Sequence, residues 1–201
     1  MKLKKMNVPN KLTVGRIILV PFFVAAMLID FPLHHLVALI IFVIASLTDM
    51  LDGKIARKNN LVTDFGKFAD PLADKILVLA ALLCFVQNGY CDCVAVIIVL
   101  FREFSVTSIR LISASKGKVV AANIFGKIKT VSQMIAIIAI LVMQLVLDLP
   151  SVGFAFPSGL SDTLNVVFFA VGEALIWIST IFAAISGIIY IIENRKFISE
   201  M

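Results

Sequence analysis

The amino-acid sequence predicts an all-α integral membrane protein with six transmembrane helices and both termini in the cytoplasm. The first observation is composition: 61% of the 201 residues are apolar and 15% are charged, whereas an average soluble domain is about 45–50% apolar and about 25% charged. The second is a series of apolar segments near the roughly 20 residues needed to cross a bilayer. The third is the restriction of basic residues to alternate connections. Together with a mean hydropathy of +1.05, these features exclude a soluble globular domain, a disordered chain and a disulfide scaffold.

Six apolar segments divide the chain and leave little room for a separate soluble domain, so we expect a single membrane domain over residues 1–201. The expected spans are residues 12–29, 36–56, 71–88, 92–115, 126–148 and 164–192. A helix of about 21 residues is about 31 Å long, which is enough to span. The segments lack the two-residue alternation of barrel strands and are too long for them. They must then be helices, because every backbone polar group in lipid needs an internal partner.

The first three segments each carry a distinguishing feature. The first follows the basic stretch Met1-Lys2-Leu3-Lys4-Lys5 and superficially resembles a signal peptide. Its small-residue cleavage pattern is poor and more spans follow, so we interpret it as a retained span. The second carries Asp49 and Asp52 in its last turns, and the third begins at Pro71. His34 and His35, in the connection before the second span, are expected to be solvated loop residues.

The fourth and fifth segments carry basic residues toward the cytoplasmic side. Arg102 and Arg110 in the fourth are eight residues apart, about 80° around a helix, so they lie broadly on one side. Lys127 and Lys129 enter the fifth about 200° apart, so only one of them is expected to face a common pocket squarely. Glu173 lies within the sixth span and has no assigned role.

The distribution of Lys and Arg predicts the orientation of the chain. The connections at residues 30–35, 88–93 and 148–163 contain none of the 18 basic residues. In a six-span arrangement all 18 therefore lie on one side. The positive-inside rule assigns that side, with both termini, to the cytoplasm.

Charge and cysteines argue against two classes of function. The net charge of +5 is better explained by membrane orientation and anionic ligands than by nucleic acid. Cys84, Cys91 and Cys93 form no C-x-x-C pair, so we expect small apolar fillers and no thiolate metal site.

Four aspartates form the most informative pattern in the chain. Asp49 and Asp52 are spaced i, i+3 and Asp70 and Asp74 are spaced i, i+4, so each pair shares a helix face. Both pairs lie at the cytoplasmic ends of consecutive antiparallel spans, which a short hairpin would bring together. Burying each carboxylate costs at least about 2.5–3.5 kcal/mol, so cations must compensate. All-oxygen ligands suit Mg²⁺, Mn²⁺ or Ca²⁺, and two such ions about 3.5–4 Å apart would clamp a phosphoryl group.

The pattern Asp-x2-Asp-Gly-x2-Ala-Arg-x8-Gly-x3-Asp-x3-Asp over residues 49–74 resembles the signature of the CDP-alcohol phosphotransferases. Every fixed position is matched, by Asp49, Asp52, Gly53, Ala56, Arg57, Gly66, Asp70 and Asp74. The resemblance implies the CDP-alcohol phosphotransferase fold with six transmembrane helices, a homodimer and dependence on divalent metal. It also implies transfer of a phosphate-containing group from a CDP-linked donor to an alcohol.

The resemblance covers nearly the whole chain and is closest to the bacterial phosphatidylglycerophosphate synthases. The residues that carry it are 7–13 with Arg16, 68–75, 102–104 with Arg110, and 126–130. It implies transfer of the phosphatidyl group from CDP-diacylglycerol to sn-glycerol 3-phosphate in anionic phospholipid biosynthesis. It also implies location in the cell inner membrane, among membrane lipids, with the active site facing the cytoplasm.

The resemblance assigns roles to individual residues. Asp49, Asp52, Asp70 and Asp74 hold two Mg²⁺, with Mn²⁺ as an alternative, and Asp74 is the general base. The CDP-diacylglycerol site comprises Asn10, Thr13, Gly53, Ala56, Arg57, Thr63, Gly66 and Lys67. The glycerol 3-phosphate site comprises Arg102, Arg110, Lys127 and Lys129, and a basic pocket suits a phosphate-bearing acceptor.

Alternative interpretations stay open at the level of sequence. The basic side chains can snorkel or contact anionic lipid, and Arg102 can pair with Glu103 instead of a ligand. Within the family, the alternative is a cardiolipin synthase that uses CDP-diacylglycerol and phosphatidylglycerol. Outside it, intramembrane carboxylates also mark cation transporters, although those place ligands near the bilayer midplane.

Overall fold

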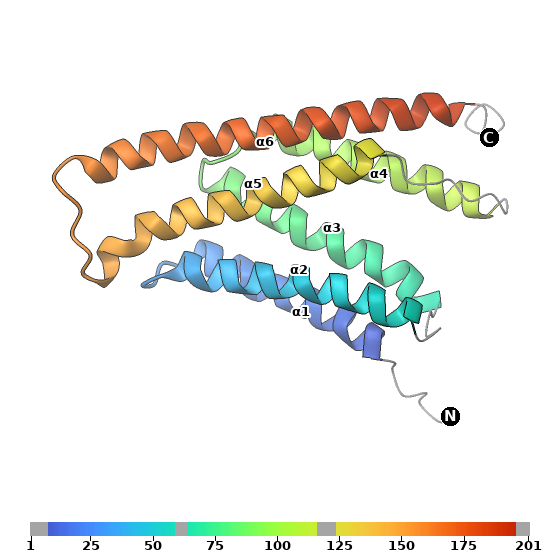
Figure 1. Cartoon of the computed structure of the whole chain (residues 1–201), viewed down its shortest axis with the longest axis horizontal. Coiled ribbons are helices and arrows are strands. Elements are labelled where there is room, and N and C mark those ends of the chain that lie inside the picture. The colour runs from blue at the N-terminus through green and yellow to red at the C-terminus, as the bar shows by residue number, and fades with distance from the viewer. Residues whose placement is uncertain (1–7, 59–63, 116–123, 196–201) are drawn as a thin grey trace. The chain divides into compact units, whose positions relative to one another are not determined.

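The computed structural model describes residues 8–58, 64–115 and 124–195. Within these ranges it leaves undescribed the side chains of residues 8–9, 49–58, 64–71, 74, 111 and 114–115. The described chain forms six long helices and one short 3₁₀ helix and contains no strand (Figure 1). The helices are α1 (Val8–Leu28), α2 (His34–Lys58), α3 (Asp64–Gln87), α4 (Cys93–Ser115), α5 (Ile124–Asp148), η1 (Leu149–Val152) and α6 (Leu160–Glu193). The all-α prediction is therefore confirmed for the described residues.

The helices coincide with the expected spans, with one larger difference. Helix α3 begins at Asp64, seven residues before the expected start, so Pro71 lies inside the helix. The apolar pattern marks only the part of a helix that suits lipid, and the polar first turns of α3 extend beyond it. Segments of α1, α5 and α6 are long and apolar enough to cross a membrane, whereas α2 and α3 contain shorter apolar stretches. Six complete spans and the orientation of the termini stay predictions.

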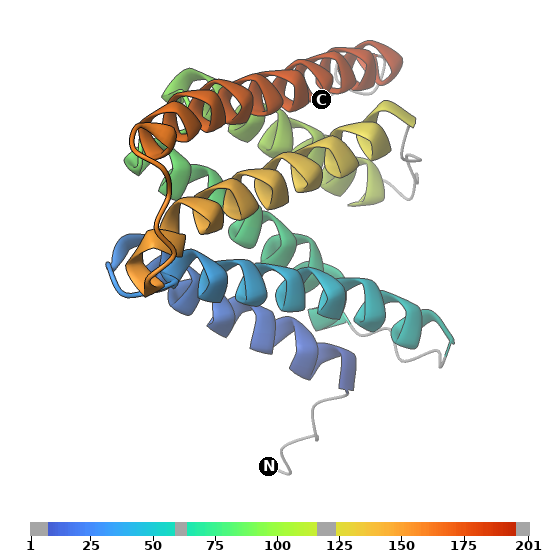
Figure 2. The same ribbon diagram turned by 60° about the vertical axis from the view of Figure 1, so that its left-hand side comes forward.

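The chain divides into two compact units. The first comprises Met1–Cys84 with Leu141–Ser161, and the second comprises Phe85–Ile140 with Asp162–Met201. In the first unit, α1 and α2 lie side by side and antiparallel (Figures 1 and 2). Phe23 and Phe42 pack between them with ring centroids 5.9 Å apart. This hairpin includes the helix that carries Asp49 and Asp52.

The connection between α1 and α2 contradicts the prediction for the two histidines. His34 and His35 are the first residues of α2, and their side chains are only 14% and 12% exposed. The Nδ1 of His34 lies 3.0 Å from the carbonyl oxygen of Ala26, and the backbone N–H of His35 donates to Asp148 at 3.1 Å. The expectation of solvated loop residues is wrong because Ala26 and Asp148, the latter 113 residues from His35, hold the side chains inward.

In the second unit, contacts between α4 and α6 run in the same order along both helices. The Tyr90 hydroxyl, just before α4, donates to Asn165, Arg102 donates to Ser186, and Arg110 lies over the Tyr190 ring. The two helices therefore run parallel, as alternate helices do in an up-and-down series. The buried side of α6 is rich in small residues, namely Gly172, Ser179, Thr180, Ala183, Ser186 and Gly187, which lets helix backbones approach closely.

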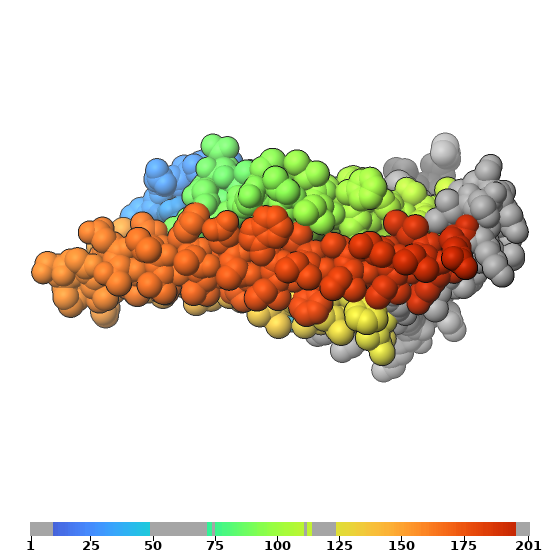
Figure 3. Space-filling model, turned by 90° about the horizontal axis from the view of Figure 1, so that it is seen from above, coloured from blue at the N-terminus to red at the C-terminus, as the bar shows by residue number. Residues whose placement is uncertain are grey.

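The opposite side of α6 is apolar and exposed (Figure 3). Its side chains include Val166, Ile178, Ile181, Ile185 and Ile188, which are 39–70% exposed. A row of this kind suits contact with lipid, since large contiguous apolar patches are rare on soluble monomers.

Candidate active site

The aspartate signature lies on two consecutive helices of the first unit. Asp49 and Asp52 belong to the last turns of α2, and Asp70 and Asp74 belong to the first turns of α3. The helical spacing on which the face prediction rests is therefore confirmed for the backbone. The four side chains lie outside the described set, so their convergence on metal ions stays a prediction.

The nucleotide residues of the signature follow the same helices. Gly53, Ala56 and Arg57 stand in α2, and Gly66 and Lys67 stand in α3. Thr63 lies outside the described residues, as do the side chains of the other five. Their positions are consistent with a site at the ends of these two helices.

The first half of α1 carries polar side chains that are buried. Asn10 is 8% exposed and Thr13 is fully buried. The contacts of Ala26 with His34 and of Phe23 with Phe42 fix the register of the hairpin. Because antiparallel helices rise equally per residue, this register puts Thr13 about level with the α2 turn that carries Asp49 and Asp52. That Asn10 and Thr13 belong to the nucleotide site stays a prediction.

Arg16 is a residue whose role sequence reasoning missed. Its side chain is 1% exposed, which makes it one of the largest fully buried groups described. A buried guanidinium is retained only with anionic or hydrogen-bonding partners, and four carboxylates stand on α2 and α3 of the same unit. The sequence feature that could have indicated this role is a basic residue four positions inside an apolar span.

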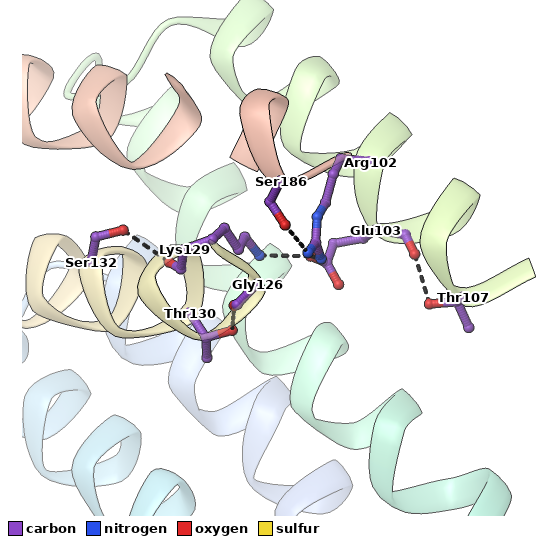
Figure 4. A network of polar contacts seen from close by, with 8 residues as sticks. All are labelled: Arg102, Glu103, Thr107, Gly126, Lys129, Thr130, Ser132 and Ser186. Atoms are coloured by element: carbon purple, nitrogen blue, oxygen red, sulfur yellow. Dashed lines mark hydrogen bonds and ion pairs between the residues drawn. The ribbon is translucent and has the colours of Figure 1, made fainter. Parts of the chain in front are cut away.

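Two basic residues of the second unit, Arg102 and Lys129, form a network around the Glu103 carboxylate (Figure 4). Arg102 Nη1 and Lys129 Nζ each donate to Glu103 Oε1 at 2.7 Å. Arg102 Nη2 also donates to the Ser186 hydroxyl at 2.8 Å. The side chains of Arg102, Glu103 and Lys129 are 12%, 13% and 6% exposed. The structure thus bears out the Glu103 pairing that the sequence left as an alternative for Arg102.

This network has the electrostatic character of an anion site. The three side chains carry a net formal charge of +1 in a largely buried place. Charge-assisted hydrogen bonds from Arg and Lys to phosphate oxygens are short and strong.

The other two predicted acceptor residues lie outside the network. Arg110 is exposed, with its guanidinium carbon 5.6 Å from the centre of the Tyr190 ring. Lys127 is exposed and Lys129 is buried, which confirms that only one of these lysines faces inward. Arg102 and Arg110 both contact α6, which confirms that they share one side of α4.

Comparison with known proteins identifies the chain's relatives. A family model described as CDP-alcohol phosphatidyltransferase matches residues 6–185. A protein of Bacillus subtilis is 43% identical over 200 residues, covering 94% of this chain and 95% of its own length. A protein of Rickettsia bellii is 34% identical over 192 residues, covering 95% and 97%. One of Haemophilus influenzae is 39% identical over 137 residues, covering 66% and 74%. All three are named CDP-diacylglycerol–glycerol-3-phosphate 3-phosphatidyltransferase.

Proposed function

Because the chain belongs to the CDP-alcohol phosphatidyltransferase family, we propose that it transfers the phosphatidyl group of CDP-diacylglycerol to sn-glycerol 3-phosphate. The products are phosphatidylglycerophosphate and CMP. The observation that carries the proposal is the similarity to relatives named for this reaction, at up to 43% identity over almost the whole chain. The complete aspartate signature and the buried basic network support it.

The reaction is a displacement at phosphorus. The free primary hydroxyl of glycerol 3-phosphate attacks the phosphatidyl phosphorus, and a new O–P bond forms. The O–P bond to the CMP phosphate breaks, and CMP leaves with the electron pair. Asp74 takes the proton of the hydroxyl, a task that requires a group within hydrogen-bond reach of it.

The aspartates supply a donor set that fits the metal of the family. Four carboxylates on helices of one unit offer only hard oxygen ligands, which Mg²⁺ and Mn²⁺ prefer. We propose that Asp49, Asp52 and Asp70 hold one Mg²⁺ and that Asp49, Asp70 and Asp74 hold the other. When bound, the ions neutralise charge on the donor pyrophosphate and on departing CMP.

The remaining residues bind the two substrates. Gly53, Ala56, Arg57, Thr63, Gly66 and Lys67 hold the CDP group, with Asn10 and Thr13 beside them. Arg102, Arg110, Lys127 and Lys129 hold the acceptor phosphate. Of these, Arg102 and Lys129 are already oriented by Glu103, so binding a phosphate requires little reorganisation.

The setting of the enzyme follows from its substrates. The donor's acyl chains stay in lipid, so the site belongs at the membrane boundary. We propose a multi-pass protein of the cell inner membrane, with its active site at the cytoplasmic face and a homodimeric assembly.

Two alternatives remain for experiment. A cardiolipin synthase would use the same donor with phosphatidylglycerol, whose headgroup phosphate also suits Arg102. A cation transporter would need ligands near the middle of its spans, whereas the aspartates stand at helix ends, so the enzyme is favoured.

Acceptor choice tests the proposal directly. Purified protein in detergent receives Mg²⁺, CDP-diacylglycerol and one acceptor at a time, and CMP release is measured. We expect release with glycerol 3-phosphate and none with phosphatidylglycerol, inositol phosphate or serine. Release only with phosphatidylglycerol would assign cardiolipin synthesis, and no release from folded, metal-loaded protein would contradict the enzyme.

A further inference from the structure

A second cluster of metal-binding side chains lies at the opposite end of α2 from the aspartate signature. It consists of His34, His35 and Asp148, and its ligand atoms lie within 4.8 Å of one another. The side chains are 12–14% exposed, so an ion could enter without unfolding. All three residues belong to the first unit. We call this group the histidine–aspartate cluster.

His34 already has the hydrogen bond that orients a metal ligand. Its Nδ1 lies 3.0 Å from the carbonyl oxygen of Ala26. A carbonyl only accepts, so Nδ1 carries the proton and the Nε2 of the neutral ring keeps its lone pair. Metal-binding histidines commonly donate their other ring N–H to a backbone carbonyl in this way.

The free nitrogen of His34 faces the Asp148 carboxylate without bonding to it. The distance from Nε2 to Asp148 Oδ1 is 3.7 Å, which is too long for a hydrogen bond. In the neutral ring, two electron-rich atoms therefore face each other across a short gap. A cation between them would remove that repulsion.

His35 completes the group beside His34, with the centroids of the two rings 3.9 Å apart. Its Nδ1 lies 2.9 Å from Asp148 Oδ1 and 3.0 Å from Oδ2. Its Nε2 is buried and has no partner among the described residues. If a metal takes Nδ1, the ring proton moves to Nε2, the position that now lacks a partner.

The spacing suits a tetrahedral ion. Zn²⁺ bonds to nitrogen and oxygen at about 2.0–2.2 Å, which puts neighbouring ligand atoms about 3.3 Å apart. The distances of 2.9 and 3.7 Å to Asp148 Oδ1 lie on either side of that value. We propose that His34 Nε2, His35 Nδ1 and the Asp148 carboxylate bind Zn²⁺, with a water molecule as fourth ligand. Two imidazole donors favour Zn²⁺ over Mg²⁺.

This site is separate from the proposed catalytic ions. His34 and Asp49 are 15 residues apart on the same helix, which is about 22 Å along its axis. The cluster joins the start of α2 to the end of α5. A bound ion would therefore tie these two helix ends together and act on stability, while the transfer reaction would not require it.

Histidine NMR tests the proposal, because the chain has only two histidines. Protein with ¹⁵N-labelled histidine and no polyhistidine tag is titrated with Zn²⁺. Excess Mg²⁺ is present so that the aspartates of the signature bind Mg²⁺ instead of Zn²⁺. A Cys93→Ser background removes the exposed thiol. We expect both imidazoles to shift together with one Zn²⁺ bound per chain. Imidazole signals that do not respond to Zn²⁺ would overturn the proposal.

Substitutions separate a metal site from a hydrogen-bonded contact. His34→Gln and Asp148→Asn should each weaken Zn²⁺ binding by at least about tenfold and abolish the Zn²⁺-dependent rise in melting temperature. Activity with Mg²⁺ should persist in His34→Gln, which shows that the variant folds. If Zn²⁺ raises the melting temperature equally in His34→Gln and in the parent, the ion binds elsewhere and the proposal fails.

Discussion

At the scale of single residues, some charged side chains form ion pairs within the protein, whereas others are expected to bind a ligand. A lone charge within a span costs at least about 2.5–3.5 kcal/mol. Arg102 and Lys129 avoid that cost by sharing Glu103. The four aspartates of the signature instead place four like charges at the ends of two helices. Their compensation is expected from metal ions and from cations that include the buried Arg16.

The first prediction concerns the general base. Asp74→Asn keeps the size of the side chain but removes the proton acceptor and a metal ligand. Turnover should fall by at least about 10²–10⁴-fold, the usual contribution of a general base. The measurements are CMP release at saturating substrates and the melting temperature in metal-free buffer, which should not fall because one repelling charge is lost.

The matched control for Asp74 is Asp162→Asn, the same change at an exposed position in the first turn of α6. It should leave turnover unchanged. Wild-type turnover in Asp74→Asn would remove this residue as the base.

The second prediction concerns the acceptor site. Arg110 is exposed and its guanidinium lies over the Tyr190 ring, so it is accessible to an incoming phosphate. Arg110→Ala should raise the KM for glycerol 3-phosphate more than the KM for CDP-diacylglycerol. Arg195→Ala, at an exposed arginine two residues after the end of α6, is the control and should change neither. Equal increases in both KM values for Arg110→Ala would indicate a structural role instead.

At the scale of helices, apolar length predicts the spans but underestimates the helices that carry the site. Helix α3 starts within a polar stretch, and α2 continues to Lys58 beyond its apolar part. These polar extensions carry the aspartate signature. On α6, small residues determine how closely α4 can approach.

The third prediction tests that close approach. A Cβ at Gly187 would lie 2.9 Å from Arg102 Cγ and 3.6 Å from Arg102 Cβ. These atoms belong to the stem of the side chain, so Gly187→Ala must shift α6 or displace Arg102 from Ser186. We expect a lower melting temperature, equivalent to about 1–3 kcal/mol, and weaker binding of glycerol 3-phosphate.

Gly15 provides the matched control for Gly187. A Cβ there meets nothing within 4 Å, and alanine favours a helix over glycine by up to about 1 kcal/mol. Gly15→Ala should therefore keep or raise the melting temperature. An equal or larger loss in Gly15→Ala than in Gly187→Ala would refute the packing argument.

At the scale of the whole molecule, the orientation in the membrane rests on the placement of basic residues. The connection before α4 contains no Lys or Arg and holds Cys91, and Cys93 is the first residue of α4. Cys93 is exposed, whereas Cys84 and Cys91 are buried. Burial, together with the nearby carboxylates of Asp92 and Glu173, raises the pKa of the Cys91 thiol to about 12. Since the thiolate is the reactive form, Cys93 is the thiol that should react.

The fourth prediction uses this thiol to test the topology. A membrane-impermeant maleimide should label the protein in right-side-out vesicles at neutral pH, and Cys93→Ser should abolish the labelling. Inverted vesicles should label only after permeabilisation. Labelling of inverted vesicles alone would reverse the predicted orientation and move the proposed active site away from the cytoplasm.

The sequence by itself determined the helices, the polar ends that carry the aspartates, and the family. Apolar length, helical spacing and fixed motif gaps are local properties, so they can be read without knowing which helices meet. Only the tertiary structure decided the partners: Arg102 and Lys129 with Glu103, Arg110 with Tyr190, and the two histidines with Asp148. Lys129 and Glu103 are 26 residues apart in the sequence, and His35 and Asp148 are 113 residues apart. Pairings of this kind depend on which helix faces pack together, and sequence periodicity does not specify that.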